Sequence, residues 1–176
     1  MTQKQLVFQQ DFTPLRLPGS AGVVVTQCTR AGNLVWFTGQ TGHTFDGEFV
    51  GGGDAATQTR QACENLKALV EMAGGSMRDI VRIVTHVTDR GYREAVYPVM
   101  REYFEEPVPC GTGLVVKGLA REELLVEIDA WAFIDDRDTR KSLVRSKHLG
   151  PNRMTGTAGM AAQVYRAGNQ IGRAHV

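Results

Sequence analysis

Cysteine and long apolar runs are scarce in this sequence, and their scarcity excludes several classes of protein. The three cysteines, Cys28, Cys63 and Cys110, are odd in number and form no C-x-x-C pair, so the sequence predicts free thiols rather than a disulfide framework or a zinc site. The longest apolar runs, at residues 34–37 and 124–134, have the length of a strand, too short to cross a bilayer. The polar first residues predict no signal peptide, so we expect a cytoplasmic protein that does not enter a membrane.

An excess of charge of one sign is also missing. The chain has 20 Lys and Arg residues against 19 Asp and Glu residues, a formal net charge of +1, and no basic stripe that would predict a nucleic-acid partner. The four histidines lack the paired spacing of metal ligands, and the glycines within 47–53 lack the lysine of a phosphate-binding loop. We therefore expect no metal and no cofactor. What is present, 42% hydrophobic and 22% charged residues, is typical of a soluble domain with one core.

Apolar periodicity predicts an α+β fold. Segments 23–28 and 34–38, rich in β-branched and aromatic residues, flank a Gly-Asn turn and predict a hairpin. Asp54 is a good N-cap for a helix of about five turns that ends at Gly74. Further elements are predicted as strands at 80–88, 114–116 and 124–134 and a helix at 92–105, where Pro98 either kinks the helix or marks its true start. This order predicts a single mixed β-sheet with two helices packed on one face.

The last predicted strand has large apolar groups on both of its faces. One face carries Val126, Ile128, Ala130, Ala132 and Ile134, and the other carries Leu125, Glu127, Asp129, Trp131 and Phe133. Two helices can cover only one face of a sheet, so the face with Trp131 and Phe133 is predicted to pack against a second subunit. Glu127 and Asp129 are then expected at or beside an interface.

The composition becomes polar after the last predicted strand, and the chain then repeats part of its own beginning. The pattern GTAG, Q, RAGN within 156–169 follows the order and almost the spacing of GSAG, Q, RAGN within 19–33. The predicted segments are a domain at 1–134, a polar linker at 135–155, the start of a truncated second copy at 156–171 and a sequencing-derived terminus at 172–176. An unusual natural tail is the alternative for this last segment.

Four segments carry a resemblance to a known family. They are GNLVWFTGQ at 32–40, QTRQACENLK at 58–67, VTHVTD at 84–89 and VEIDA at 126–130. In this order they resemble the Rid superfamily, the YjgF, YER057c and UK114 group, over roughly residues 20–134. The resemblance implies the fold shared by YjgF and chorismate mutase and a homotrimer with clefts between subunits, or a pseudo-symmetric assembly in a tandem protein. In the archetypal branch it also implies hydrolysis of 2-imino acids to 2-keto acids without a cofactor.

The resemblance also identifies candidate site residues and one departure. The archetypal branch has a Pro-x-Arg-x-Cys segment whose arginine holds the substrate carboxylate, and here Gly111 stands at the arginine and Gly113 at the cysteine. Glu127 matches the cleft glutamate, thought to position or activate water, and is the candidate catalytic residue; an interface carboxylate paired with a basic group is the alternative. The candidate substrate-binding residues are Thr38, Gly39, Gly111 and Thr112, although the Thr38 hydroxyl could instead satisfy backbone groups.

Two functions therefore remain open at this point. The first is a Rid-like enzyme that hydrolytically deaminates an imine, an enamine or a related small metabolite in a cleft between subunits. Its activity on 2-imino acids is expected to be poor because Gly111 replaces the arginine, and neither Lys117 nor Arg121 is an obvious substitute. The second is a non-catalytic member that binds a small metabolite in the same cleft.

Overall fold

The hairpin predicted from the sequence begins the sheet. The computed structural model describes residues 5–11 and 24–135. Strands β2 (Val24–Ala31) and β3 (Leu34–Gln40) pair in antiparallel register, with Ala31 opposite Leu34. Gly32 lies in the turn with a φ of 61°, which glycine adopts without steric cost. The local sequence is thus sufficient to form this hairpin.

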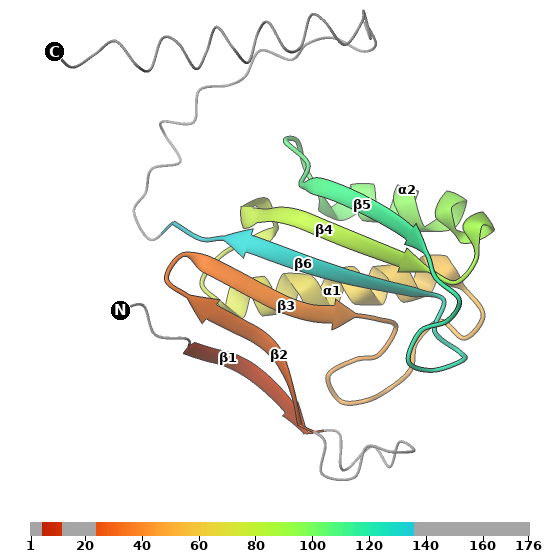
Figure 1. Cartoon of the computed structure of the whole chain (residues 1–176), viewed down its shortest axis with the longest axis horizontal. Helices are drawn as coiled ribbons and strands as arrows, with labels where there is room; N and C mark the ends of the chain where they lie inside the picture. The colour runs from red at the N-terminus through yellow and green to blue at the C-terminus, as the bar shows by residue number, and fades with distance from the viewer. Residues whose placement is uncertain (1–4, 12–23, 136–176) are drawn as a thin grey trace, which may run out of the picture. The chain divides into compact units, whose positions relative to one another are not determined.

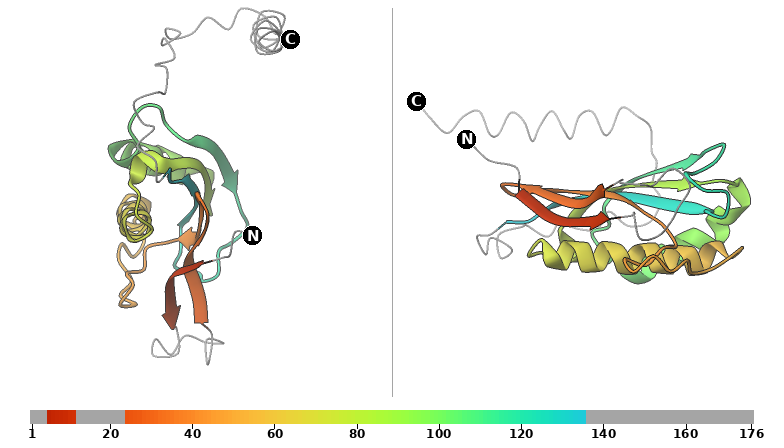
Figure 2. Two further views of the ribbon diagram at one scale, coloured as in Figure 1. Left: turned by 90° about the vertical axis from the view of Figure 1, so that its left-hand side faces the viewer. Right: turned by 90° about the horizontal axis from the view of Figure 1, so that it is seen from below.

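Six strands make one mixed sheet in the order β1-β2-β3-β6-β4-β5 (Figure 1). The other elements are β1 (Gln5–Asp11), α1 (Ala55–Met72), η2 (Met77–Asp79), β4 (Ile80–Val87), η3 (Arg90–Tyr92), α2 (Arg93–Tyr103), β5 (Cys110–Val115) and β6 (Val126–Phe133). Strands β4 and β5 are parallel, and every other neighbouring pair is antiparallel. Figure 2 shows both helices on the same face of the sheet, as the sequence predicts.

Burial of β6 explains how the core is built. This strand lies between β3 and β4, and its inward residues Val126, Ile128, Ala130 and Ala132 are fully buried. Helix α1 covers them with Leu66 and Leu69, which are also fully buried, and Asp54 caps the helix by accepting a hydrogen bond of 3.0 Å from the backbone N–H of Ala56. The alternation predicted for β6 is therefore confirmed, and its second face is left without a helix.

Three local predictions need correction. Strand β1 was not predicted, because its sequence QLVFQQD is largely polar, which an edge strand paired on one side tolerates. Strand β5 begins at Cys110 rather than 114, because backbone pairing with β4 holds Gly111 and Gly113 extended despite the low strand propensity of glycine. Helix α2 begins at Arg93, so Pro98 lies inside it and does not mark its start.

Two further expectations concern cysteines and membranes. All three cysteines are free, and Cys110 is exposed. Burial raises the pKa of the Cys28 thiol to about 11. Burial is also the main cause that raises the pKa of the Cys63 thiol to about 12. No helix within the described residues is long and apolar enough to span a membrane. The predicted linker, second copy and sequencing-derived terminus lie outside the described residues, apart from Asp135.

Candidate active site

An aromatic and aliphatic patch covers part of the sheet face that carries no helix. Leu34 and Trp36 on β3 pair across the strands with Phe133 and Trp131 on β6. Leu34, Trp36 and Phe133 are each 40–46% exposed in the single chain. We call these four residues the open-face patch. A contiguous exposed group of large apolar side chains marks a surface that packs against something else.

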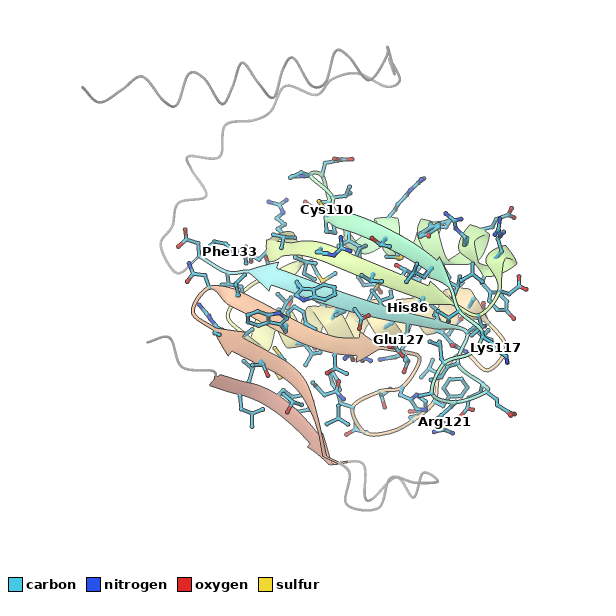
Figure 3. The ribbon with its side chains drawn as sticks, in the orientation of Figure 1. His86, Cys110, Lys117, Arg121, Glu127 and Phe133 are labelled. Atoms are coloured by element: carbon cyan, nitrogen blue, oxygen red, sulfur yellow. The ribbon has the colours of Figure 1, made fainter. Side chains whose placement is uncertain are left out.

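Beside the open-face patch, one histidine and two carboxylates come together from neighbouring strands. His86 on β4 lies opposite Glu127 on β6, and Asp129 follows two residues later on the same face. Their nearest ligand atoms all lie within 4.8 Å of one another, and His86 Nδ1 is 3.6 Å from Asp129 Oδ2. Figure 3 shows His86 and Glu127 side by side on this face. We call the three residues the acid-histidine cluster.

Burial and like charge perturb the carboxyl groups of this cluster. Partial burial raises the pKa of Glu127, the neighbouring Asp129 raises it further, and His86 opposes these effects. Partial burial likewise raises the pKa of Asp129. His86 Nδ1 is buried and has no hydrogen-bond partner among the described residues. A carboxylate with a raised pKa accepts a proton more readily, so the cluster is suited to general acid-base chemistry.

The acid-histidine cluster is also a set of donors for a divalent cation. One imidazole and two carboxylates suit Zn²⁺ or Mn²⁺, and three protein ligands leave a position open for water. Ligand atoms around a tetrahedral Zn²⁺ lie roughly 3.4 Å apart, so the side chains of the cluster, now within 4.8 Å, would have to move slightly closer. The sequence predicts no metal site, because only the register of β4 against β6 brings His86 next to Glu127.

Gly39 and Thr38 lie at the end of β3, where Gly39 contacts Glu127. A Cβ atom at position 39 would lie 2.7 Å from Glu127 Cδ and 2.8 Å from its Cγ, so Glu127 can occupy its place only because residue 39 is glycine. The Thr38 hydroxyl donates a 2.6 Å hydrogen bond to the backbone oxygen of Thr26. This is the backbone role considered for Thr38 from the sequence, and its oxygen can still accept a hydrogen bond.

The other two candidate substrate-binding residues, Gly111 and Thr112, lie on β5. A Cβ atom at Gly111 would make an ordinary contact of 3.7 Å with Ile83 on the helix-covered face. The Thr112 hydroxyl accepts a 3.1 Å hydrogen bond from Arg82. Within one chain, therefore, Gly111 faces the opposite side of the sheet from Glu127. The structure brings Glu127 and Gly39 together, but it does not place Gly111 beside them.

Neither of the two cations considered as substitutes for the missing arginine lies near Gly111. Figure 3 shows Lys117 and Arg121 beyond the far end of β5 from Cys110, the neighbour of Gly111. Arg121 forms an ion pair with Glu123, and its Nη1 lies 3.3 Å from Nε2 of His43. Arg121 is thus held in another part of the domain.

A single mixed sheet, with helices on one face and an acid-histidine cluster on the other, places this domain among the two-layer α+β folds of the YjgF type. Residues 19–134 match the family model described as Endoribonuclease L-PSP. The chain belongs to this family, which is the family of the Rid and YjgF proteins that its four segments resemble. The predicted family and fold class are therefore confirmed.

Three similar proteins illustrate the relationship. RutC family protein PH0854 of Pyrococcus horikoshii is 35% identical over 109 residues, 61% of this chain and 85% of that protein. The 3-aminoacrylate deaminase RutC of Acinetobacter baylyi is 33% identical over 106 residues, 60% of this chain and 83% of that protein. The crystal structure of RidA from the Antarctic bacterium Psychrobacter sp. PAMC 21119 superposes with a TM-score of 0.59 at 31% identity, covering 62% of this chain and 88% of that chain.

Proposed function

We propose that this protein hydrolyses an imine or enamine of a small metabolite, with Glu127 as the catalytic carboxylate. The observation that carries the proposal is the half-buried position of Glu127 beside Asp129 and His86, where its pKa is raised. In this reaction Glu127 takes a proton from water as the water oxygen attacks the carbon of the C=N bond. Glu127 returns this proton to the nitrogen, which gives a carbinolamine. The proton of the carbinolamine hydroxyl then moves to the nitrogen as the C–N bond breaks, and the products are ammonia and a carbonyl compound. An enamine first tautomerises to the imine and then reacts in the same way.

The family supports this class of substrate over nucleic acid. A relative one third identical is named as a deaminase of 3-aminoacrylate, which is an enamine. The family description names an endoribonuclease, but the charge of +1 gives this chain no excess of cations for binding phosphates. The three free cysteines are consistent with a reducing compartment, so a cytoplasmic location is part of the proposal.

We also propose that the catalytic cleft forms between subunits of a closed homotrimer. Gly111 and Glu127 lie on opposite faces of the sheet within one chain, so a cleft lined by both requires two subunits. The exposed open-face patch supplies the apolar surface that such an assembly would bury. In a tandem protein, a pseudo-symmetric assembly of both copies would serve the same purpose.

A second candidate function is non-catalytic binding of a metabolite, and Gly111 is the observation that favours it. Without the arginine of the archetypal branch, the carboxylate of a 2-imino acid loses a bidentate, charge-assisted contact. Removal of such a contact at a desolvated site costs several kcal/mol, and about 1.4 kcal/mol is tenfold in rate. We therefore expect the native protein to hydrolyse 2-iminopropanoate and 2-iminobutanoate poorly.

The test compares the native protein with Glu127→Gln, Gly111→Arg and the control Glu122→Gln. Glu122 is an exposed glutamate near Glu127 in sequence, so its substitution changes the charge equally without touching the cluster. Imino acids are generated in place by an amino-acid oxidase, an enamine is supplied separately, and ammonia release is followed. Enamine turnover that Glu127→Gln abolishes and Glu122→Gln retains supports the proposal. No turnover of any substrate by the native protein or Gly111→Arg would leave the binding function.

A further inference from the structure

The two carboxylates of the acid-histidine cluster have no strong counter-charge. Within residues 5–11 and 24–135, neither Glu127 nor Asp129 forms an ion pair with a lysine or an arginine, and the basic group beside them is the imidazole of His86. Two half-buried carboxylates with ligand atoms within 4.8 Å of each other repel when both are charged. A cation bound between them would remove this repulsion.

The imidazole of His86 is placed as a metal ligand rather than as a hydrogen-bonding group. Its Nδ1 atom is buried and has no hydrogen-bond partner in the described part of the chain. Asp129 Oδ2 lies 3.6 Å from this atom, which is too far for a hydrogen bond. Ligand atoms around a tetrahedral Zn²⁺ lie roughly 3.4 Å apart. The separation of His86 Nδ1 from Asp129 Oδ2 therefore fits two ligands of one ion.

The third ligand, Glu127, stands on a rigid support. It lies opposite His86 on β6 and β4, which are neighbouring strands inside the sheet. Gly39 leaves the space that the Glu127 side chain occupies. Ligands carried by paired strands keep their spacing better than ligands on loops. The cluster lies on the face that carries no helix, so a fourth position remains open to water (Figure 3).

We propose that the acid-histidine cluster binds one Zn²⁺ per chain, and that zinc switches off the reaction proposed for Glu127. His86 Nδ1 and one oxygen of each carboxylate are the ligands, and water takes the fourth position. The imidazole favours Zn²⁺ over Mg²⁺ and Ca²⁺, which prefer oxygen ligands. A carboxylate bound to Zn²⁺ is a weaker base, so Glu127 no longer takes a proton from the attacking water. The inhibition rests on the proposed function, whereas zinc binding does not.

Zinc binding is tested on the full chain by calorimetry after bound metal has been removed with EDTA. The native protein should bind one more Zn²⁺ per chain than His86→Gln or Asp129→Asn. Loss of a ligand should weaken binding at least about tenfold, because loss of a ligand's hydrogen-bonding partner already costs about 10–100-fold. Cys110→Ser and Glu122→Gln are the controls, since each removes an exposed potential ligand outside the cluster, and both should bind zinc like the native protein.

A second measurement needs no variant. Nitrogen-15 NMR of the native protein should show that Zn²⁺ shifts the Nδ1 signal of His86, because Nδ1 becomes a ligand. An Nδ1 signal that saturating zinc leaves unshifted would overturn the site. Equal zinc binding by the native protein, His86→Gln and Asp129→Asn, with all three folded by their thermal midpoints, would overturn it as well.

The inhibition is tested by ammonia release from an enamine. Saturating zinc should lower native turnover at least about a hundredfold, the least that a general base usually contributes, and EDTA should restore it. Half-inhibition of Asp129→Asn should need at least about tenfold more zinc. Turnover that zinc leaves unchanged or increases would overturn the inhibition. If the metal-free protein turns over no enamine, the proposed function and the inhibition both fail, while calorimetry and NMR still decide whether zinc binds.

Discussion

Replacing Asp129 by asparagine should lower the pKa of Glu127, because it removes the negative charge that raises this pKa in addition to burial. The two carboxylates have ligand atoms within 4.8 Å of each other. At this separation and an effective dielectric constant of about 40–80, suited to half-exposed groups, two unit charges interact by about 1–2 kcal/mol. A repulsion of this size is large enough to be measured, so the pKa of Glu127 should fall in Asp129→Asn.

His86→Gln should move the same pKa in the opposite direction, because His86 lowers the pKa of Glu127. The assay is a carbon-13 NMR titration of the Glu127 carboxyl group in EDTA-treated protein, which needs no turnover and no bound cation. Asp46→Asn serves as the control, since it removes an exposed carboxylate from another loop. If Glu127 catalyses the reaction, the acid limb of the pH-rate profile should shift with its pKa. An unchanged pKa of Glu127 in both Asp129→Asn and His86→Gln would refute the electrostatic coupling within the acid-histidine cluster.

Four further predictions concern stability and assembly. Light scattering should show a closed oligomer at micromolar concentration, and Trp131→Glu in the open-face patch should dissociate it; a well-folded native monomer would contradict this. Deleting residues 136–176 should shift the thermal midpoint by less than about 2 °C, because the described core is complete without them. Gly39→Ala should cost about 1–3 kcal/mol of unfolding free energy and displace Glu127, since its Cβ atom would lie 2.7 Å from Glu127 Cδ. Burial raises the pKa of Asp129 in the folded state, so protonation of Asp129 favours folding and this contribution is lost as the pH rises. Asp129→Asn removes the buried charge, so it should raise the thermal midpoint at neutral pH and leave it unchanged near pH 4.

Local sequence patterns predicted the parts of the fold that depend on residues close together in the sequence. The Gly32 turn defines the β2-β3 hairpin, Asp54 caps α1, and alternation along β6 separates its buried face from the face with Trp131. Strand β1 and the first half of β5 depend instead on pairing with a neighbouring strand. Edge strands bury little surface of their own, so their sequences carry a weak hydrophobic signal.

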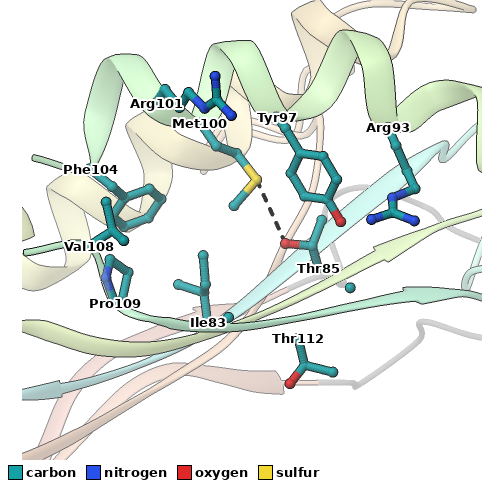
Figure 4. A pocket seen from close by; sticks show the side chains of 12 residues that line it. Ile83, Thr85, Arg93, Tyr97, Met100, Arg101, Phe104, Val108, Pro109 and Thr112 are labelled. Atoms are coloured by element: carbon teal, nitrogen blue, oxygen red, sulfur yellow. Dashed lines mark hydrogen bonds between the residues drawn. The ribbon is translucent and has the colours of Figure 1, made fainter. Parts of the chain in front are cut away.

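The candidate site likewise contains one residue that a local motif identified and others that only the folded structure brings together. Glu127 was found because it lies in a short motif, VEIDA, that resembles a family segment. Its neighbour His86 was treated as an ordinary strand residue, because only the register of β4 against β6 brings the two together. A pocket between α2 and strands β4 and β5 is lined by Thr85, Arg93 and Tyr97 among other residues (Figure 4). The sequence did not reveal it, because no sequence period shows where α2 packs across these two strands.

The contact between Gly39 and Glu127 also constrains how this protein can evolve. Because a Cβ atom at position 39 would overlap the Glu127 side chain, any replacement of Gly39 must either follow or accompany the loss of the long carboxylate. The two positions, on neighbouring strands of the sheet, are therefore expected to change together among descendants of this gene. A lineage that loses Glu127 is released from the requirement for glycine, so the residue found at position 39 would record whether this carboxylate is still under selection.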